Sequence, residues 1–169
     1  MTELVFRADR LVLRLVDGGV RFVVIGGFAG QLHGSSLITY DLDICYARDD
    51  ANIAALVVVL TELRTTLRGA PPDVPFRLDV VSIRNGDAFT FNTELGPLDI
   101  LGTVARDRER VDYDAFLPNA VEVELEGRTF KVAGLDDIMA MKRAAGRPKD
   151  LIALENLGAL REEIDRRPD

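Results

Sequence analysis

A glycine pair and an aspartate pair on neighbouring apolar segments constrain this sequence more than any other feature. Gly26-Gly27 follows one apolar run, and Asp41 and Asp43 are separated by a single residue in the next. Side chains alternate between the two faces of a strand, so both carboxylates project from the same face. Two such carboxylates repel each other unless a cation lies between them or one takes a proton. Mg²⁺ prefers oxygen ligands and shares its coordination shell with phosphates, so the pattern predicts a metal–nucleotide site.

The glycine pair lies where a strand is expected to turn into a helix. Glycine lets the backbone approach a phosphate closely, and free N–H groups at such a turn can face the phosphate. We therefore expect Gly26 and Gly27 to contact the phosphates of a bound nucleotide.

Composition narrows the class of protein. A chain of 169 residues with 47% hydrophobic content predicts one globular domain over residues 1–169. The apolar run 53–60 is too short to span a membrane, and early charged residues interrupt any secretory signal. The single cysteine, Cys45, excludes an internal disulfide and predicts a buried, reduced thiol; the single histidine, His33, excludes a multi-histidine zinc site. We expect a cytoplasmic protein without a membrane partner.

The net charge of −7 argues against broad electrostatic binding to nucleic acid. A local cationic patch nevertheless lies within eight residues and consists of Lys142, Arg143, Arg147 and Lys149. Such a patch could contact nucleic acid, although the overall charge favours a small molecule.

Hydrophobic periodicity and turn residues predict alternating helices and strands. The predicted helices span residues 3–17, 28–33, 49–68, 135–145 and 148–161. The predicted strands span residues 21–25, 38–46, 76–83, 88–93, 96–101, 120–126 and 128–132, with hairpin turns at Asn85-Gly86 and Gly127. The expected fold class is α/β (α+β): a mixed sheet of about five or six strands flanked by helices, with two C-terminal helices from about residue 135.

A third carboxylate could complete the metal site. Asp99 and Asp79 each lie between apolar residues in a predicted strand. An acid in such a position is costly unless it binds something, so both are candidates.

The glycine pair followed by Asp-apolar-Asp resembles the DNA polymerase β-like nucleotidyltransferase superfamily. In that family the glycines hold the triphosphate, the paired acids bind two Mg²⁺ ions, and a third acid lies on a neighbouring strand. The resemblance implies nucleotide binding by Gly26 and Gly27, and metal binding and catalysis by Asp41 and Asp43. Segment 96–101 is similar to the third-acid strand of small members, which favours Asp99 over Asp79. The implied cofactor is Mg²⁺, or Mn²⁺ in its place, with an NTP as the donor.

The C-terminal part, residues 135–151, is similar to the small bacterial AbiEii-type and MenT-type toxin nucleotidyltransferases. In those proteins a helix lysine and a downstream aspartate belong to the active site, and the matching positions are Lys142 and Asp150. A basic residue often precedes the paired acids in that family, but Leu37-Ile38 supplies none here. The triphosphate charge would therefore be met by Lys142, Arg143 or another cation.

The implied activity is metal-dependent transfer of a nucleoside monophosphate from an NTP to an acceptor hydroxyl. The toxin resemblance implies an acceptor on tRNA, another RNA or a protein, and a cognate antitoxin. One alternative is an enzyme that modifies an antibiotic or small metabolite, which suits the acidic charge. A second alternative is a non-catalytic nucleotide-binding module of the same fold.

Overall fold

The computed structural model describes residues 6–168 and contains two β-sheets and several helices. The strands are β1 (Phe22–Ile25), β2 (Leu42–Tyr46), β3 (Thr66–Leu67), β4 (Ala88–Thr93), β5 (Gly96–Leu101), β6 (Thr103–Arg106), β7 (Glu109–Asp112), β8 (Val121–Leu125) and β9 (Arg128–Val132). The helices are α1 (Ala8–Asp17), α2 (Gly26–Leu32), α3 (Asp50–Glu62), α4 (Val80–Asn85), α5 (Tyr113–Phe116), α6 (Leu135–Ala145) and α7 (Pro148–Arg166).

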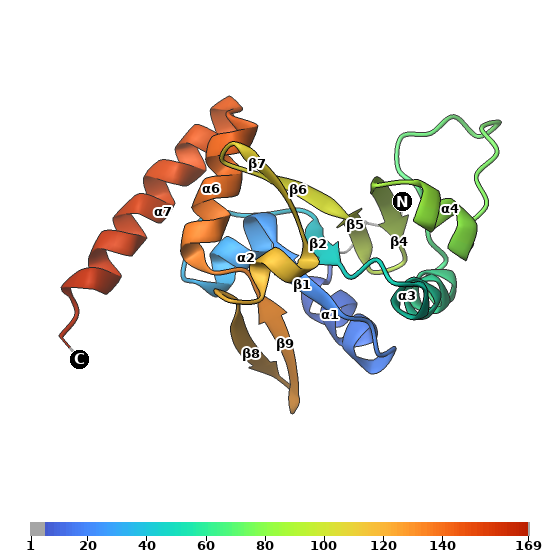
Figure 1. Ribbon diagram of the computed structural model, residues 1–169, viewed down its shortest axis with the longest axis horizontal. Helices are drawn as coiled ribbons and strands as arrows, with labels where there is room; N and C mark the ends of the chain where they lie inside the picture. Colours follow the sequence, from blue (N-terminus) through green and yellow to red (C-terminus); the bar gives the residue numbers. More distant parts are fainter. Residues whose placement is uncertain (1–5, 169) are drawn as a thin grey trace.

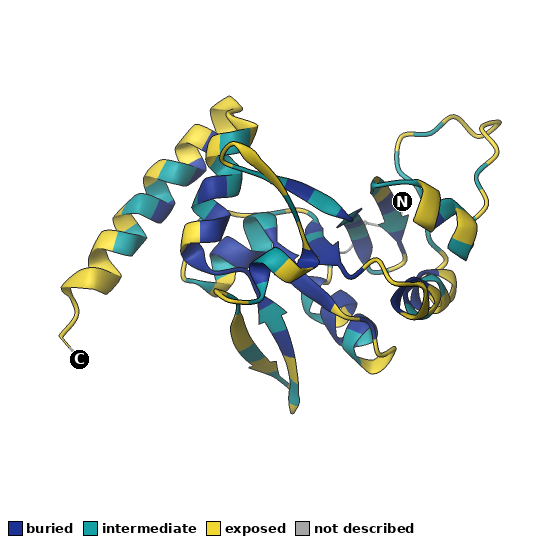
Figure 2. Cartoon of the chain, viewed as in Figure 1, coloured by how far each residue is buried: buried dark blue, intermediate teal, exposed yellow. Residues whose placement is uncertain are grey.

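The main sheet has seven strands in the order β3-β4-β5-β2-β1-β9-β8, and β6 and β7 form a separate hairpin (Figure 1). Its central strands are apolar and buried, as Figure 2 shows. β1 pairs antiparallel with β2, while β2 pairs in parallel with β5 although the two lie far apart in the sequence. The mixed sheet confirms the predicted fold class.

Helices pack around this sheet and position the C-terminal segment. α2 contacts β1 and β2, and it also contacts α6. α6 in turn packs against α7 and β6 (Figure 1). In the described part of the chain, no helix is both long and apolar enough to cross a bilayer.

Several predicted elements match the structure closely. The observed bounds of β4, β5, β9 and α6 equal the predicted ones, and the β8–β9 hairpin turns at Gly127 as expected. α7 extends five residues beyond the prediction, to Arg166. Cys45 is buried as predicted, and burial raises the pKa of its thiol to about 12.

The predicted hairpin around Asn85-Gly86 is wrong. Residues 80–85 form helix α4, and the Asp79 side chain caps it by accepting a hydrogen bond from the Ser82 backbone N–H at 2.8 Å. Gly86 has φ −96°, whereas a two-residue Asn-Gly turn requires positive φ. An Asp followed three residues later by Ser stabilises a helix start, and this local signal prevailed over the strand propensity.

Three further boundaries differ from the prediction. α3 ends at Glu62 rather than near residue 68, because Arg64 adopts φ +52° and the chain then enters β3. β2 begins at Leu42, so Asp41 lies just before the strand instead of within it. The first helix begins at Ala8, and the predicted residues 3–5 lie outside the described residues.

The charged segment 106–110 forms the tip of the β6–β7 hairpin. Arg106 pairs with Glu109 across this turn. With β3 and both strands of the hairpin, the described chain has more strands than the five or six predicted.

Candidate metal and nucleotide site

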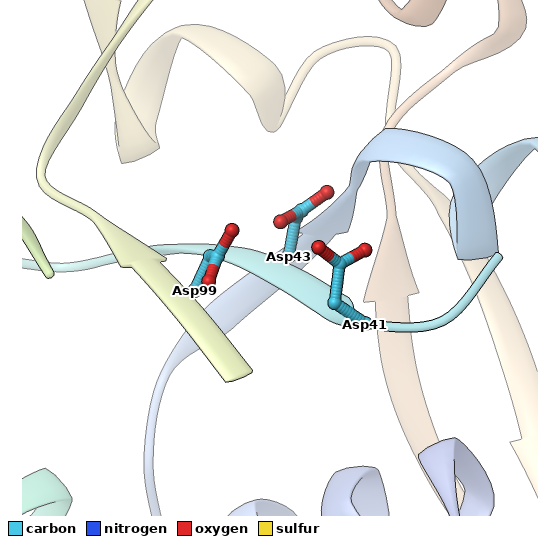
Figure 3. Close-up of side chains that lie close together, drawn as sticks. All are labelled: Asp41, Asp43 and Asp99. Carbon is cyan, nitrogen blue, oxygen red and sulfur yellow. The ribbon is translucent and has the colours of Figure 1, made fainter. Parts of the chain in front are cut away.

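The sheet register brings three aspartates together. Asp43 of β2 and Asp99 of β5 are direct partners in the parallel ladder, and Asp41 lies immediately before β2. One carboxylate oxygen from each of the three lies within 4.8 Å of the others. Figure 3 shows the three side chains grouped at this point. The structure thus places Asp99 beside the predicted pair, while Asp79 caps α4 instead.

The glycine turn lies directly against these acids. Ile25, the last residue of β1, pairs with Asp43, and the chain turns at Gly26 with φ +72°. A Cβ atom at Gly26 would lie 2.1 Å from Asp43 Oδ2, and one at Gly27 would lie 2.9 Å from Thr39 Oγ1. Both positions therefore require glycine because the backbone closely approaches the acid-bearing segment.

Thr39 is a site residue that the sequence did not reveal. Its Oγ1 lies 3.2 Å from the Asp41 backbone carbonyl and 3.3 Å from Asp41 Oδ1, so the hydroxyl can donate to either oxygen. Because Asp41 precedes the strand, this contact helps to fix a carboxylate that no ladder holds. A hydroxyl residue two positions before the paired acids is the signal that could have identified it.

Burial and mutual repulsion disfavour the charged form of two of the three carboxylates. Burial, with the nearby charges of Asp41 and Asp99, raises the pKa of Asp43 to about 8, and the positive charge of Lys142 opposes this shift. Burial also raises the pKa of Asp99, against the opposing charge of Arg68. Oxygen-only ligands in this repulsive arrangement fit Mg²⁺ or Mn²⁺, since a bound cation removes the repulsion.

Arg68 is the second unpredicted residue. It continues the edge of β3, where its backbone N–H donates to the Thr90 carbonyl at 2.9 Å, and its guanidinium forms an ion pair with Asp99. Arg68 was expected at the end of the long helix over residues 49–68, whereas it follows β3 in the structure.

The predicted C-terminal residues divide between two places. Lys142 Nζ donates to Asp150 Oδ1 at 3.3 Å, and Arg147 Nε donates to Asp150 Oδ2 at 2.6 Å. Asp150 is fully buried, so these two cations balance its charge. Arg143 instead pairs with Asp107 and lies outside the groove that contains the acids. Arg147 and Lys149 take the place in the groove that was expected for Arg143.

One groove contains all of these groups. It has a volume of about 840 Å³, within the range typical of small-molecule sites. Its lining includes the glycine turn, the three acids and the charged residues of the α6–α7 junction: Gly26, Gly27, Asp41, Asp43, Asp99, Lys142, Arg147, Lys149 and Asp150.

Solved structures share this architecture. The crystal structure of the lincosamide antibiotic adenylyltransferase LnuA, with lincomycin bound, has a TM-score of 0.60 to this chain. The alignment covers 94% of this chain and 99% of LnuA at 12% identity. This chain has a nucleotidyltransferase fold.

The antibiotic-resistance factor ANT(2'')-Ia has the same nucleotidyltransferase fold. Its solution structure gives a TM-score of 0.53 at 13% identity and covers 93% of this chain and 90% of its own. The crystal structure of its complex with adenylyl-2''-tobramycin also gives 0.53 at 13% identity, covering 90% and 91%. No protein-family model and no curated protein sequence matches this chain. The predicted fold is thus supported, and the superfamily and the toxin type stay predictions.

Proposed function

We propose that this protein is a metal-dependent nucleotidyltransferase that transfers a nucleoside monophosphate from an NTP to an acceptor hydroxyl. The observation that supports this proposal is the group of three carboxylates on paired strands, within 4.8 Å of one another and against a glycine turn. Phosphoryl transfer requires mainly positioning and charge stabilisation, and this groove has the groups for both.

Asp41, Asp43 and Asp99 would hold Mg²⁺, which when bound lowers the pKa of an attacking hydroxyl and neutralises phosphate charge. Thr39 orients Asp41, and Arg68 orients Asp99. Gly26 and Gly27 let the turn lie directly against Asp43 and Thr39, because a Cβ atom at either position would collide with one of those side chains.

The cations at the α6–α7 junction supply positive charge that is missing before the paired acids. Lys142 and Arg147 share their charge with Asp150, while Lys149 lines the groove without a carboxylate partner among the described residues. Together they form a wall suited to the triphosphate.

Replacing each acid by asparagine tests the assignment. Wild-type protein with Mg²⁺, each α-labelled NTP and cell extract is expected to transfer label, and Asp41→Asn, Asp43→Asn or Asp99→Asn to lower the rate about 100-fold or more. Asp79→Asn is the matched control, because asparagine also caps helices and this acid lies outside the site. Equal rates in the three variants and wild type would exclude these residues from catalysis. The absence of any Mg²⁺-dependent transfer by wild-type protein would reject the proposed nucleotidyltransferase activity.

The acceptor is the finer part of the proposal. The sequence resemblance implies tRNA, another RNA or a protein, with a cognate antitoxin. LnuA is a lincosamide antibiotic adenylyltransferase with lincomycin bound, and ANT(2'')-Ia is in complex with adenylyl-2''-tobramycin, which favours the small-molecule alternative. A non-catalytic nucleotide-binding module would bind Mg²⁺–NTP without transferring label.

A further inference from the structure

The groove has two ends that differ in charge. The glycine turn and the cations Lys142, Arg147 and Lys149 form one end. The sheet order places β4 and β5 on the other side of β2 from the glycine turn. We call this side the neutral end, and its lining residues are Ala88, Thr90, Leu101, Val104, Ala105 and Met141.

The neutral end contains mainly apolar groups around one hydroxyl. Thr90 is exposed and is the direct ladder partner of Asp99, so its hydroxyl lies on the same face as that carboxylate. Ala88 is exposed beside it and pairs with Leu101. Among the described residues that line this end, the charged group is Asp99 at its border, and Arg68 forms an ion pair with it.

The chemistry of transfer assigns a substrate to each end. The attacking and leaving oxygens lie roughly in line on opposite sides of the phosphorus. The leaving pyrophosphate is strongly anionic, so its place is the cationic end. The acceptor hydroxyl therefore approaches from the neutral end, past Asp99.

The surface cations are already neutralised by neighbouring acids. Within residues 6–168, every Lys and Arg except Arg64, Arg108 and Lys149 has a carboxylate oxygen within 4 Å. In the C-terminal cationic patch, Asp150 pairs with Lys142 and Arg147, and Asp107 pairs with Arg143. Apart from Arg64 and Arg108, the cations outside the groove are thus already paired, so the described surface offers no broad unpaired cationic area to an RNA backbone. At the neutral end, Asp99 is itself paired with Arg68, so a polycationic acceptor would find no free carboxylate among the described residues there.

We propose that the acceptor is a neutral small molecule whose hydroxyl is attached to a body with an apolar face, and that it binds at the neutral end. This inference rests on the proposed nucleotidyltransferase function. The acceptor oxygen forms a bond to the α-phosphorus, the bond from that phosphorus to the bridging oxygen breaks, and pyrophosphate leaves. The hydroxyl proton passes to water. Thr90 and Met141 are then specificity-determining residues.

The experiment sorts acceptors by charge before the reaction. Cell extract is divided into macromolecules, small cations, small anions and small neutral compounds, and each fraction is incubated with wild-type protein, Mg²⁺ and α-labelled NTP. Chloramphenicol, tobramycin and purified tRNA are defined probes for neutral, cationic and anionic acceptors. We expect label in the neutral fraction at least tenfold above every other fraction.

A charge placed at the neutral end provides the second measurement. Ala88 is exposed, so Ala88→Glu is compatible with folding. We expect it to lower kcat/KM for the neutral acceptor at least tenfold while the dissociation constant of Mg²⁺–NTP stays unchanged. Val58→Glu, an exposed position on α3, is the matched control.

The outcomes separate this inference from the proposed function. Stronger labelling of RNA, protein or a charged small molecule would overturn the neutral acceptor and leave nucleotidyl transfer intact. Wild-type kinetics in Ala88→Glu would also overturn the binding place. Labelling of no fraction, with all four present, would reject the proposed function itself.

Discussion

At the scale of single residues, the buried carboxylate of Asp43 links the site to the stability of the fold. Its pKa of about 8 lies far above that of an exposed aspartate, because burial and two neighbouring acids disfavour its charged form. The native state therefore binds a proton that the unfolded chain releases above about pH 4.

This difference predicts a pH-dependent loss of stability in the metal-free protein. The contribution of Asp43 is fully present below about pH 4 and is lost as the pH rises through about 8. Urea unfolding in the presence of a chelator, at pH 5 to 8.5, should show Asp43→Asn gaining about 4 kcal/mol of unfolding free energy relative to wild type over this range. The substitution Asp73→Asn, at an exposed position, should show the same pH dependence of the unfolding free energy as wild type. If the unfolding free energies of Asp43→Asn and wild type differ by the same amount at every pH, the shifted pKa is contradicted.

Arg68 is expected to act as a positioning residue through its ion pair with Asp99. Arg68→Gln should lower kcat about 10- to 100-fold, because a misplaced catalytic group has an effect of this size. The dissociation constant of Mg²⁺–NTP should change much less, and Arg68→Lys should restore part of kcat by keeping the charge. Arg77→Gln, whose side chain is 89% exposed, is the control. A purely structural role would instead lower the melting temperature, without a larger effect on kcat than on the dissociation constant of Mg²⁺–NTP.

At the scale of elements, the β1–α2 turn shows how backbone geometry makes room for the site. Gly26 and Gly19 share almost the same left-handed backbone, with φ +72° and +73°. They differ in surroundings, since a Cβ at Gly26 would collide with Asp43 and one at Gly19 would meet nothing within 4 Å.

Substitutions at Gly19 and Gly26 allow the effect of backbone strain to be measured separately from the effect of the collision with Asp43. Gly19→Ala should cost about 1–2 kcal/mol of unfolding free energy from backbone strain and leave activity unchanged. Gly26→Ala should have at least that cost and also lower kcat about 100-fold, because Asp43 must move. Thermal unfolding and label transfer measure both quantities. Equal activity in the two variants would show that the contact with Asp43 is unimportant.

Elements with strong local signals could be predicted from the sequence. α6 and the β8–β9 hairpin have clear periodicity and a glycine at the turn. The region 63–86 could not be predicted, because β3 depends on pairing with β4 and α4 depends on the Asp79 cap. In both cases tertiary pairing or a side-chain cap prevailed over local propensity.

At the scale of the whole molecule, the candidate site was only partly predictable for a related reason. Asp41, Asp43 and the glycines are close in sequence, so their spacing indicates their role. Arg68 and Thr39 belong to the site because of the sheet register and the path of a loop, which no single segment encodes. The choice of Asp99 over Asp79 rested on resemblance, and the ladder between β2 and β5 gives it a physical basis.

The pairing of Asp43 with Asp99 also affects how reliably the chain folds. Side chains alternate between the faces of a sheet, so a slip of one residue between β2 and β5 would turn Leu98 and Ile100 outward and bury Asp99 in the core. A buried, unpaired carboxylate is strongly unfavourable, which makes a ladder shifted by one residue costly. The acids proposed for chemistry therefore also act as register markers, because they destabilise competing sheets more than they destabilise the native one.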